Sequence, residues 1–348
     1  MSEHDAVTPR RTPPVAVVLA AVVAVQALLM LWFAWPAQKA EPRDLPVVVA
    51  GPQQAADALA AKLGAAREGA FDVTTVADAA AADAALTDRT AYAAFIVSQP
   101  VASLGDKPAA AGVEVHVASA ASPAVATALS QLAAQMQAQF GQPGGPAVKV
   151  VDVVPTSADD PRGAGFAGSF LPLILTSIGA GVVVALLARS RPVRVAAIVG
   201  YGAGAGLLAA GLMHWTGVLA GSYLGGATAI ALLTGSIAAT VAGLYALLGR
   251  PGIALGAVLA FVVGNPLSGL ATAPEMLPQP WGEIGQFLPV GAGATLIRSA
   301  SYFDWAGATR SAIVLASYVV VGLILVATAG ARRRRPAPAE AAPELVAA

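Results

Sequence analysis

The fold is decided by residues 169–214, SFLPLILTSIGAGVVVALLARSRPVRVAAIVGYGAGAGLLAAGLMH. Two long apolar runs, Ser169–Ala188 and Val195–His214, flank a six-residue interruption that carries Arg189, Arg191 and Arg194. Each run is about twenty residues long, which is the length that an α-helix needs to cross the roughly 30 Å hydrocarbon core of a bilayer. The stretch therefore predicts two membrane-crossing helices joined by a short basic turn.

Four more apolar runs of this length occur along the chain. They are Val15–Trp35, Gly226–Gly249, Ile253–Ala273 and Ser311–Gly330. We therefore expect an α-helical integral membrane protein with six transmembrane helices. The apolar core of Val15–Trp35 is longer than the roughly 7–15 residues of a signal-peptide core, which favours an uncleaved anchor.

The positions of the arginines predict the orientation. Besides the turn at 189–194, arginines precede the first run at Arg10 and Arg11, follow the fourth at Arg250 and follow the last at Arg332–Arg335. Six crossings place all of them on one side, which the positive-inside rule assigns to the cytoplasm. We expect a multi-pass plasma-membrane protein with both termini cytoplasmic. The expected parts are a cytoplasmic tail (1–14), transmembrane helix 1 (15–35), an extracytoplasmic domain (36–165), a five-helix membrane domain (166–330) and a basic cytoplasmic tail (331–348).

Residues 36–165 alternate between strand and helix patterns. Apolar or alternating runs predict strands at Leu45–Ala50, Phe71–Val76, Ala91–Val97, Val113–Val117 and Ala147–Val154. Helices are expected after Pro52, over Ala77–Leu86, and from an N-cap at Ser122 to a stop at Gly141, with a loop over Ser98–Ala111. This order predicts a small α/β domain, with one mainly parallel sheet, inserted between transmembrane helices 1 and 2.

Charge and residue usage exclude several function classes. The formal net charge of the chain is zero, and residues 36–165 are acidic, with eight Lys and Arg against thirteen Asp and Glu. Nucleic-acid binding needs a basic face, so no nucleic-acid partner is expected. The chain has no cysteine, and of its three histidines only His116 lies in this domain. We therefore expect no enzyme, with no catalytic residues, no cofactor and no metal site.

Three polar positions are given their simplest interpretation. His116 lies on the polar face of an expected strand and is predicted to be solvated. Asp159-Asp160 is predicted to form a solvated turn rather than a cation site. His214, beside Trp215, is predicted to anchor the end of a helix at the membrane interface rather than to act as a switch.

The expected spans contain no Asp, Glu, Lys or Arg in their interior. Ion-coupled carriers usually keep such a residue inside the membrane, so a secondary transporter is disfavoured. The chain also lacks the Gly-x-x-x-x-Gly-Lys-Ser/Thr phosphate loop. If the protein moves a substrate, its energy must come from another polypeptide.

Glycine is concentrated in the expected spans. Gly200 with Gly204, and Gly202 with Gly206, form two overlapping pairs spaced four residues apart. Such pairs let helices approach closely, and the close contact can lie either inside one bundle or at a dimer face.

The fifth expected span and the segment after it are irregular. Asn265-Pro266 interrupts the span, because proline lacks a backbone donor and disfavours helix just before itself. We expect this interruption to face the transport path. Residues 274–305 are predicted to form one or two short helices at the outer membrane interface, with a re-entrant hairpin as the alternative. The residues that mark this segment are Trp281, Phe287, Arg298, Tyr302 and Phe303.

Three strings carry a resemblance to a known family. They are Asp160-Pro161-Arg162-Gly163, then Gly264-Asn265-Pro266-Leu267-Ser268-Gly269, and finally Pro274–Pro278 with Trp281, Leu288–Ala292, Arg298 and Tyr302-Phe303. In these strings and in its expected topology the chain resembles the permease subunits of type 2 ABC transporters, above all actinobacterial members with an ectodomain. It also resembles the phage-infection-protein-like membrane proteins. The resemblance implies a homodimer or heterodimer in the lipid bilayer, driven by a separate cytoplasmic ATPase that faces Arg189, Arg191, Arg194 and Arg250.

Two functions are weighed on these grounds. The first is a permease subunit of an ABC-type exporter that moves a hydrophobic, amphipathic or cell-envelope molecule across the plasma membrane. The second is a non-transporting envelope scaffold or receptor whose extracytoplasmic domain binds a surface partner. The interrupted fifth span favours the permease, because an anchor does not need it, and the small expected cytoplasmic surface favours the scaffold.

Overall fold

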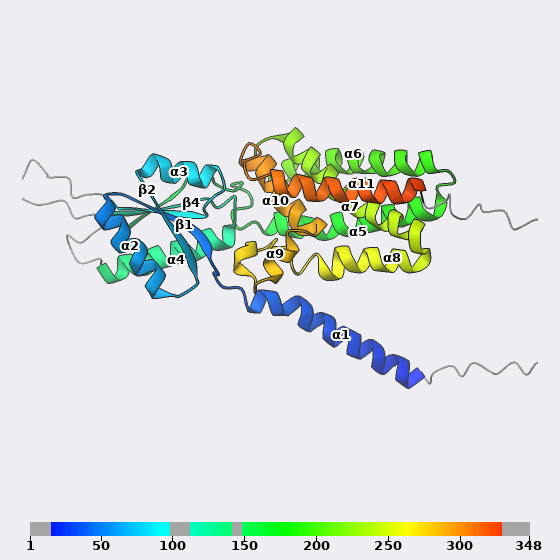
Figure 1. Cartoon of the computed structure of the whole chain (residues 1–348), viewed down its shortest axis with the longest axis horizontal. Coiled ribbons are helices and arrows are strands. Elements are labelled where there is room, and N and C mark those ends of the chain that lie inside the picture. The colour runs from blue at the N-terminus through cyan, green and yellow to red at the C-terminus, as the bar shows by residue number, and fades with distance from the viewer. Residues whose placement is uncertain (1–14, 98–111, 141–147, 329–348) are drawn as a thin grey trace, which may run out of the picture.

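The computed structural model of the chain describes residues 15–97, 112–140 and 148–328. In Figure 1 an α/β domain lies at one end of an elongated molecule and a bundle of helices at the other. We call the end of the bundle next to the α/β domain the domain end, and the opposite end the far end. The predicted tails at 1–14 and 331–348, the loop at 98–111 and the helix stop at Gly141 lie outside the described residues.

The α/β domain is built on a sheet whose described strands have the order β2-β1-β3-β4-β5. The strands are β1 (Leu45–Ala50), β2 (Phe71–Val76), β3 (Ala93–Val97), β4 (Val113–Val117) and β5 (Val148–Asp152). β1 is parallel to β2 and β3, and β4 is parallel to β5, whereas β3 and β4 are antiparallel. The predicted strands and the mainly parallel sheet are therefore confirmed.

Helices cover both faces of this sheet. α2 (Gln53–Ala66) and α4 (Pro123–Phe140) pack on one face, and α3 (Ala79–Thr87) packs on the other. Successive residues of a strand point to opposite faces. Val47 and Val49 of β1 therefore join the core beneath α2 and α4, whereas Val48 joins the core beneath α3.

The helical bundle has the helices of a multi-pass membrane protein. Five described helices are long and apolar enough to cross a membrane, with mean hydropathies between 1.8 and 2.6. They are α1 (Val15–Gln38), α5 (Ala164–Leu187), α6 (Arg191–Trp215), α7 (Tyr223–Leu248) and α11 (Thr309–Thr328). α7 is the central helix, because 61% of its most apolar window is buried, against 39% for α5 and 22% for α6 and α11.

Glycine allows α6 to lie close against α7. A Cβ atom at Gly206 would lie 2.3 Å from the Ala227 carbonyl oxygen, and one at Gly202 would lie 3.1 Å from another backbone carbonyl of α7. Gly200 and Gly204 face open space instead. One of the two glycine pairs therefore packs inside the bundle, and the other lies on its surface.

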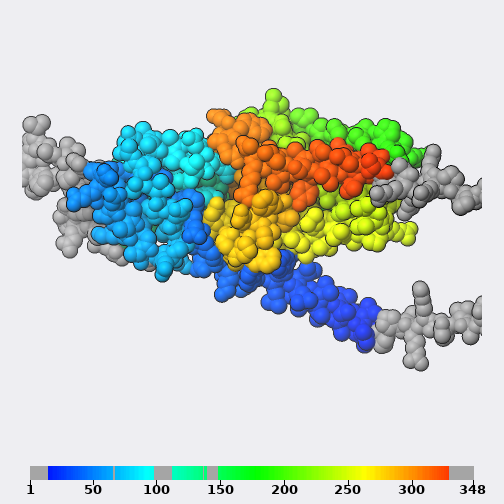
Figure 2. Space-filling view, viewed as in Figure 1, coloured from blue at the N-terminus to red at the C-terminus, as the bar shows by residue number. Residues whose placement is uncertain are grey.

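Helix α1 is separate from the bundle over most of its length. None of its most apolar window is buried, and Figures 1 and 2 show it leaving the bundle at an angle. Aromatic side chains hold only its domain end: Phe33 packs on Phe261 with ring centroids 5.5 Å apart, and Trp32 packs on Trp281 at 6.2 Å.

The predicted fifth span is shorter than expected. α8 (Arg250–Ala257) continues as a π-helix, η1 (Val258–Val263), and the chain then leaves helical structure. At α-helical rise, Arg250–Val263 extends about 21 Å, short of the roughly 30 Å core of a bilayer. The described chain thus has five full-length helices and one shorter helix where Ile253–Ala273 is predicted to cross.

Three short helices follow, η2 (Pro274–Met276), α9 (Trp281–Gly285) and α10 (Pro289–Tyr302). One or two short helices are predicted here, and the structure has three. α10 also differs from the expected surface helix, because 12 of its 14 residues are buried. It packs against α7 and α11, and Leu296 and Ile297 belong to the core of the bundle. Most residues of α10 are themselves small or apolar, so the helix can be enclosed on nearly all sides.

Candidate functional site at the interrupted helix

A non-helical stretch follows η1, and we call residues 264–273 the break. The Asn265 carbonyl accepts hydrogen bonds from the Ser268 amide (3.3 Å) and hydroxyl (2.7 Å). Pro266 has no amide hydrogen with which to continue a helix. The helix is therefore interrupted where Asn265-Pro266 predicts it.

Side chains from four distant places donate hydrogen bonds to carbonyls at and beside the break. The pairs are Trp32 Nε1 to Val262 (2.7 Å), Gln286 Nε2 to Ser268 (3.1 Å), Arg298 Nη2 to Leu270 (2.8 Å) and Ser122 Oγ to Thr272 (2.8 Å). Carbonyls outside a helix need such donors wherever water is excluded. The break is thus supported by α1, the turn after α9, α10 and the α/β domain at once.

Ser122 connects the α/β domain directly to the break. Its hydroxyl accepts a hydrogen bond from the Val125 amide (3.3 Å), which confirms the predicted N-cap of α4, and donates its proton to the Thr272 carbonyl. A hydroxyl can donate one bond and accept others at the same time. A movement of the break would therefore disturb the start of α4.

Arg298 is a buried cation next to the break, with 7% of its surface exposed. Its guanidinium lies over the Phe166 ring at 4.7 Å and donates to Leu270. Burial lowers the pKa of Arg298 to about 10, which leaves it protonated at neutral pH. Among the described residues it forms no ion pair with a carboxylate. Arg298 therefore joins α5, α10 and the break through a charge that is stabilised by a carbonyl and a ring.

The other predicted markers of residues 274–305 divide between core and surface. Phe303 is buried in the core beneath α3, and the Tyr302 hydroxyl donates to the Val218 carbonyl (3.2 Å). Trp281 and Phe287 are exposed, by 39% and 52%. Only these last two have the exposed aromatic surface that an interfacial residue needs.

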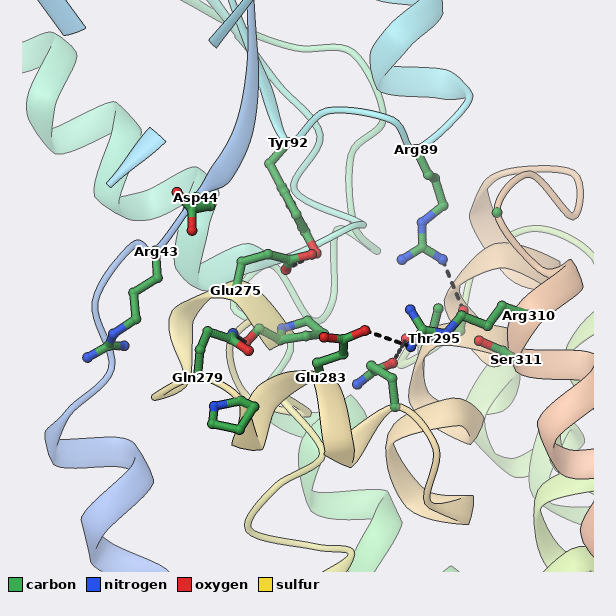
Figure 3. Close-up of a pocket in the computed structure, with 14 residues that line it drawn as sticks. Arg43, Asp44, Arg89, Tyr92, Glu275, Gln279, Glu283, Thr295, Arg310 and Ser311 are labelled. Carbon is green, nitrogen blue, oxygen red and sulfur yellow. Dashed lines mark hydrogen bonds and ion pairs between the residues drawn. The ribbon is translucent and has the colours of Figure 1, made fainter. Parts of the chain in front are cut away.

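A cavity of about 620 Å³ lies between the α/β domain and the short helices (Figure 3). Ligand pockets commonly measure roughly 300–1,000 Å³. Arg89 and Tyr92 reach into it from the α/β domain, and Glu275, Glu283 and Arg310 reach into it from the opposite side. Charged groups of both signs therefore meet in one cavity.

Most charged groups of the cavity have partners. The Tyr92 hydroxyl donates to Glu275 (2.8 Å), and Arg310 pairs with Glu283 (3.4 Å). Burial, followed by the Glu275 carboxylate, raises the pKa of Tyr92, so its phenol stays neutral. Arg89 donates to the Thr295 carbonyl (3.0 Å). The contacts of Tyr92 and Arg89 join the α/β domain to the short helices across the cavity, whereas the Arg310–Glu283 pair joins α11 to α9.

The four arginines predicted to face an ATPase lie away from the break and the cavity. Arg189 lies in the α5–α6 turn, Arg191 and Arg194 lie in the first turn of α6, and Arg250 begins α8. These helix ends are at the far end in Figure 1. Arg189, Arg191 and Arg250 are exposed. Arg194 is half-buried, and its Nε donates to the Ala188 carbonyl (3.0 Å) just after α5. That carbonyl would otherwise lack a helical partner.

Two polar residues differ from their predictions. His116 is not solvated: it is 8% exposed and lies between Asp83 (2.6 Å) and Glu114 (3.2 Å). Asp160 is 9% exposed, and its carboxylate accepts hydrogen bonds from two amides in the first turn of α5 (3.0 and 2.8 Å). A carboxylate stabilises a helix N-terminus. The sequence around each residue does not indicate these roles. The partner Asp83 belongs to α3, and residues 161–163 separate Asp160 from the start of α5.

Sequence reasoning missed the cavity residues Arg89 and Tyr92, which lie in segments of ordinary composition before β3. Glu275 belongs to one of the family-like strings, but nothing in that string indicates its partner in the α/β domain. His214 ends α6 with Nδ1 2.9 Å from the Ala210 carbonyl, and its anchoring role stays a prediction. In the described part of the chain, no three His, Asp or Glu side chains are grouped as metal ligands would be.

Compared with protein-family models, with curated proteins and with solved structures, the chain matches none. Its function has to be argued from its own geometry.

Proposed function

We propose that the chain is the membrane permease subunit of an ABC-type exporter, moving a hydrophobic, amphipathic or cell-envelope molecule across the plasma membrane. A separate cytoplasmic ATPase drives it, and two permease subunits act together as a homodimer or heterodimer. The observation that carries the proposal is the break. A helix stops there short of bilayer thickness, and side chains from four places cover carbonyls at the break and beside it.

The break supports transport for a physical reason. Non-helical backbone at membrane depth is tolerated only where protein or water covers it. Transporters use such discontinuous helices around their substrate sites, and π-helical segments such as η1 often accompany functional sites. A helix that only anchors a domain needs neither feature. The resemblance of Gly264–Gly269 to the interrupted span of type 2 ABC permeases points the same way.

The proposal includes an orientation, with the α/β domain extracytoplasmic and the far end cytoplasmic. The exposed Arg189, Arg191 and Arg250 would then face the ATPase. The chain has no cysteine, so single cysteines can be introduced at the exposed Ala65 on α2 and Ser190 in the α5–α6 turn. In intact cells an impermeant thiol reagent should label Ala65→Cys but not Ser190→Cys. The reverse pattern would contradict the orientation.

The partner is tested by purifying the tagged protein from its native membrane in mild detergent and identifying what remains bound by mass spectrometry. A nucleotide-binding ATPase in near-equal amount is the expected result. Its absence after chemical cross-linking in intact cells would overturn the proposed ATPase-driven mechanism.

The role of the break is tested by Asn265→Leu combined with Pro266→Ala. Pro266→Ala restores one backbone donor, and leucine favours helix more than asparagine, so the double variant should extend η1. Export should fall strongly while the amount of protein in the membrane is kept. Pro172→Ala is the matched control, because Pro172 lies inside the continuous helix α5 and is exposed. Equal export by wild type and the double variant would remove the break from the mechanism.

One observation favours the scaffold or receptor as a second candidate. The far-end turns are short: residues 188–190 join α5 to α6, and Gly249 alone joins α7 to α8. Such turns leave little surface for an ATPase within the described residues. Envelope proteins bound through the α/β domain, with no ATPase in the purified complex, would favour this second candidate.

A further inference from the structure

Arg89 differs from the other arginines of the cavity. In the described part of the chain, Arg43 pairs with Glu41 (2.7 Å) and Arg310 with Glu283 (3.4 Å), whereas Arg89 has no carboxylate within 4 Å. Burying a cation without an anion is unfavourable. The charges that line the cavity balance overall, with three arginines (Arg43, Arg89 and Arg310) against three carboxylates (Asp44, Glu275 and Glu283). No carboxylate contacts Arg89 directly, however, and Glu275 acts on it only from a longer distance, so an anion within hydrogen-bonding reach would stabilise its guanidinium.

The donors of Arg89 are only partly used. Nη1 donates to the Thr295 carbonyl and the Ser299 hydroxyl, and the guanidinium lies 5.0 Å from the centre of the Phe303 ring. A guanidinium has five N–H donors in a planar fork that matches the oxygens of a phosphate or carboxylate. The remaining donors of Arg89 are available to such a group in the cavity.

The backbone at Arg89 gives a second, independent reason. Arg89 follows the last turn of α3 with a φ of 59°, in the left-handed conformation. Glycine or asparagine usually occupies this place after a helix, because other side chains are strained there. Figure 3 shows the Arg89 side chain directed from this position into the cavity. A strained residue at a cavity suggests that the side chain has a role there.

Apolar side chains lie beside one of the arginines that line the cavity. Arg310 lines the cavity and lies over the Phe287 ring at 4.4 Å. Phe287, which follows α9, is 52% exposed, and Ile284 and Trp281 of α9 are also exposed. These three side chains do not line the cavity itself. A ligand whose charged end enters the cavity therefore has apolar surface beside it for a hydrocarbon part.

From this juxtaposition we infer that the cavity binds an amphiphile with an anionic head group, such as a phospholipid-like molecule. Arg89 and Arg310 contact the phosphate or carboxylate, and the apolar part lies along Phe287 and Ile284. That the amphiphile is the exported cargo rests on the proposed permease function, whereas binding itself does not.

The inference is tested by calorimetric titration of the full chain in neutral detergent. The probes are dihexanoyl phosphatidylglycerol, which is anionic, dihexanoyl phosphatidylcholine, which is zwitterionic, and inorganic phosphate. We expect the anionic lipid to bind at least about tenfold more tightly than either other probe, since hydrogen bonds to a charged group exceed this factor. Equal affinity for both lipids would overturn the inference, and equal affinity for phosphate would overturn its amphiphilic part.

Variants tie the binding to the cavity. Arg89→Asn, which suits the left-handed backbone, and Arg310→Gln should each weaken binding of the anionic lipid about tenfold. Glu283→Gln should tighten it, because Arg310 loses a competing carboxylate; a misfolded variant would not gain affinity. Arg162→Gln is the control, since Arg162 is exposed and does not line the cavity. Unchanged binding in both arginine variants, or weaker binding in Glu283→Gln, would refute the site.

The test is separate from that of the proposed function. Binding is measured without an ATPase, so a missing ATPase leaves the lipid site standing. Equally, an ATPase that co-purifies with a chain that binds no anionic lipid would keep the permease and reject the site.

Discussion

Replacing Gly206 by alanine should destabilise the bundle, whereas the same change at Gly204 should stabilise it. A Cβ atom at Gly206 would lie 2.3 Å from the Ala227 carbonyl oxygen, whereas one at Gly204 meets no atom within 4 Å. A carbon and a carbonyl oxygen normally stay about 3.3 Å apart, so α6 would have to move by about 1 Å. Because the atom that is hit belongs to the backbone of α7, it can yield only if the helix itself shifts.

The magnitude follows from two opposing effects. Overpacking of this kind costs about 3 kcal/mol, near the upper end of its usual range, and alanine gains up to about 1 kcal/mol over glycine in a helix. Gly206→Ala should therefore lose about 2 kcal/mol and Gly204→Ala should gain up to about 1 kcal/mol. Gly202→Ala should fall between them, because its Cβ atom would lie 3.1 Å from a carbonyl of α7.

The assay is equilibrium unfolding of the purified protein in mixed micelles with increasing SDS, followed by circular dichroism. Molecular mass is measured alongside, by light scattering. The order of stability should be Gly204→Ala, wild type, Gly202→Ala, Gly206→Ala. A loss at Gly204→Ala as large as at Gly206→Ala would refute the reasoning. If that loss came with a lower mass, the surface pair Gly200 and Gly204 would be a dimer contact instead.

Three further predictions concern the contacts around the break and the cavity. Ser122→Ala should cost more stability than the roughly 1 kcal/mol of a lost N-cap, because the Thr272 carbonyl of the break also loses its donor. Thermal unfolding measures the loss, and Asp78→Ala, which removes only the N-cap of α3, is the control. Burial and Glu275 raise the pKa of Tyr92, so the stabilisation by its neutral phenol is complete below the pKa of about 10 of a free tyrosine and is lost as the pH rises above that value. The free energy of unfolding of Tyr92→Phe should therefore fall less steeply than that of the wild type at alkaline pH. The same pH dependence in both proteins would contradict this prediction. Trp32→Phe keeps the aromatic packing but removes the hydrogen bond of 2.7 Å from Trp32 to the Val262 carbonyl, so it should lower stability by about 0.5–1.5 kcal/mol. Limited proteolysis between α1 and the α/β domain should then become faster. An unchanged rate of cleavage would show that packing alone holds α1.

Much of the fold follows from local patterns in the chain. The strands of the α/β domain occur where apolar runs and alternation predict them, and Ser122 caps α4 as its position before Pro123 indicates. The five full-length helices also lie where apolar runs of about twenty residues predict them. These features depend on neighbours in the sequence, because helices and strands repeat over a few residues.

Other predictions failed where burial depends on distant partners. The alternation of His116 with apolar residues in β4 predicts an exposed side chain, yet Asp83 of α3 covers it. The polar and proline-rich composition of residues 274–305 predicts a surface segment, yet α7, α11 and the α/β domain enclose α10. In both places the residues are ordinary, and the surroundings decide their environment.

The apolar runs and the arginines between them are sufficient to infer a multi-span helical protein with an inserted α/β domain, and Asn265-Pro266 is sufficient to locate the interruption. Hydrophobic period, proline and charge act over one helix or one turn, so the chain expresses them locally. The cavity has no such local sign, because Tyr92 and Glu275 are 183 residues apart and meet only when the α/β domain packs on the short helices. The packing of these parts decides which carbonyls of the break need a donor and which of the arginines that line the cavity have no carboxylate partner. Hydrogen bonding and burial are properties of the assembled fold.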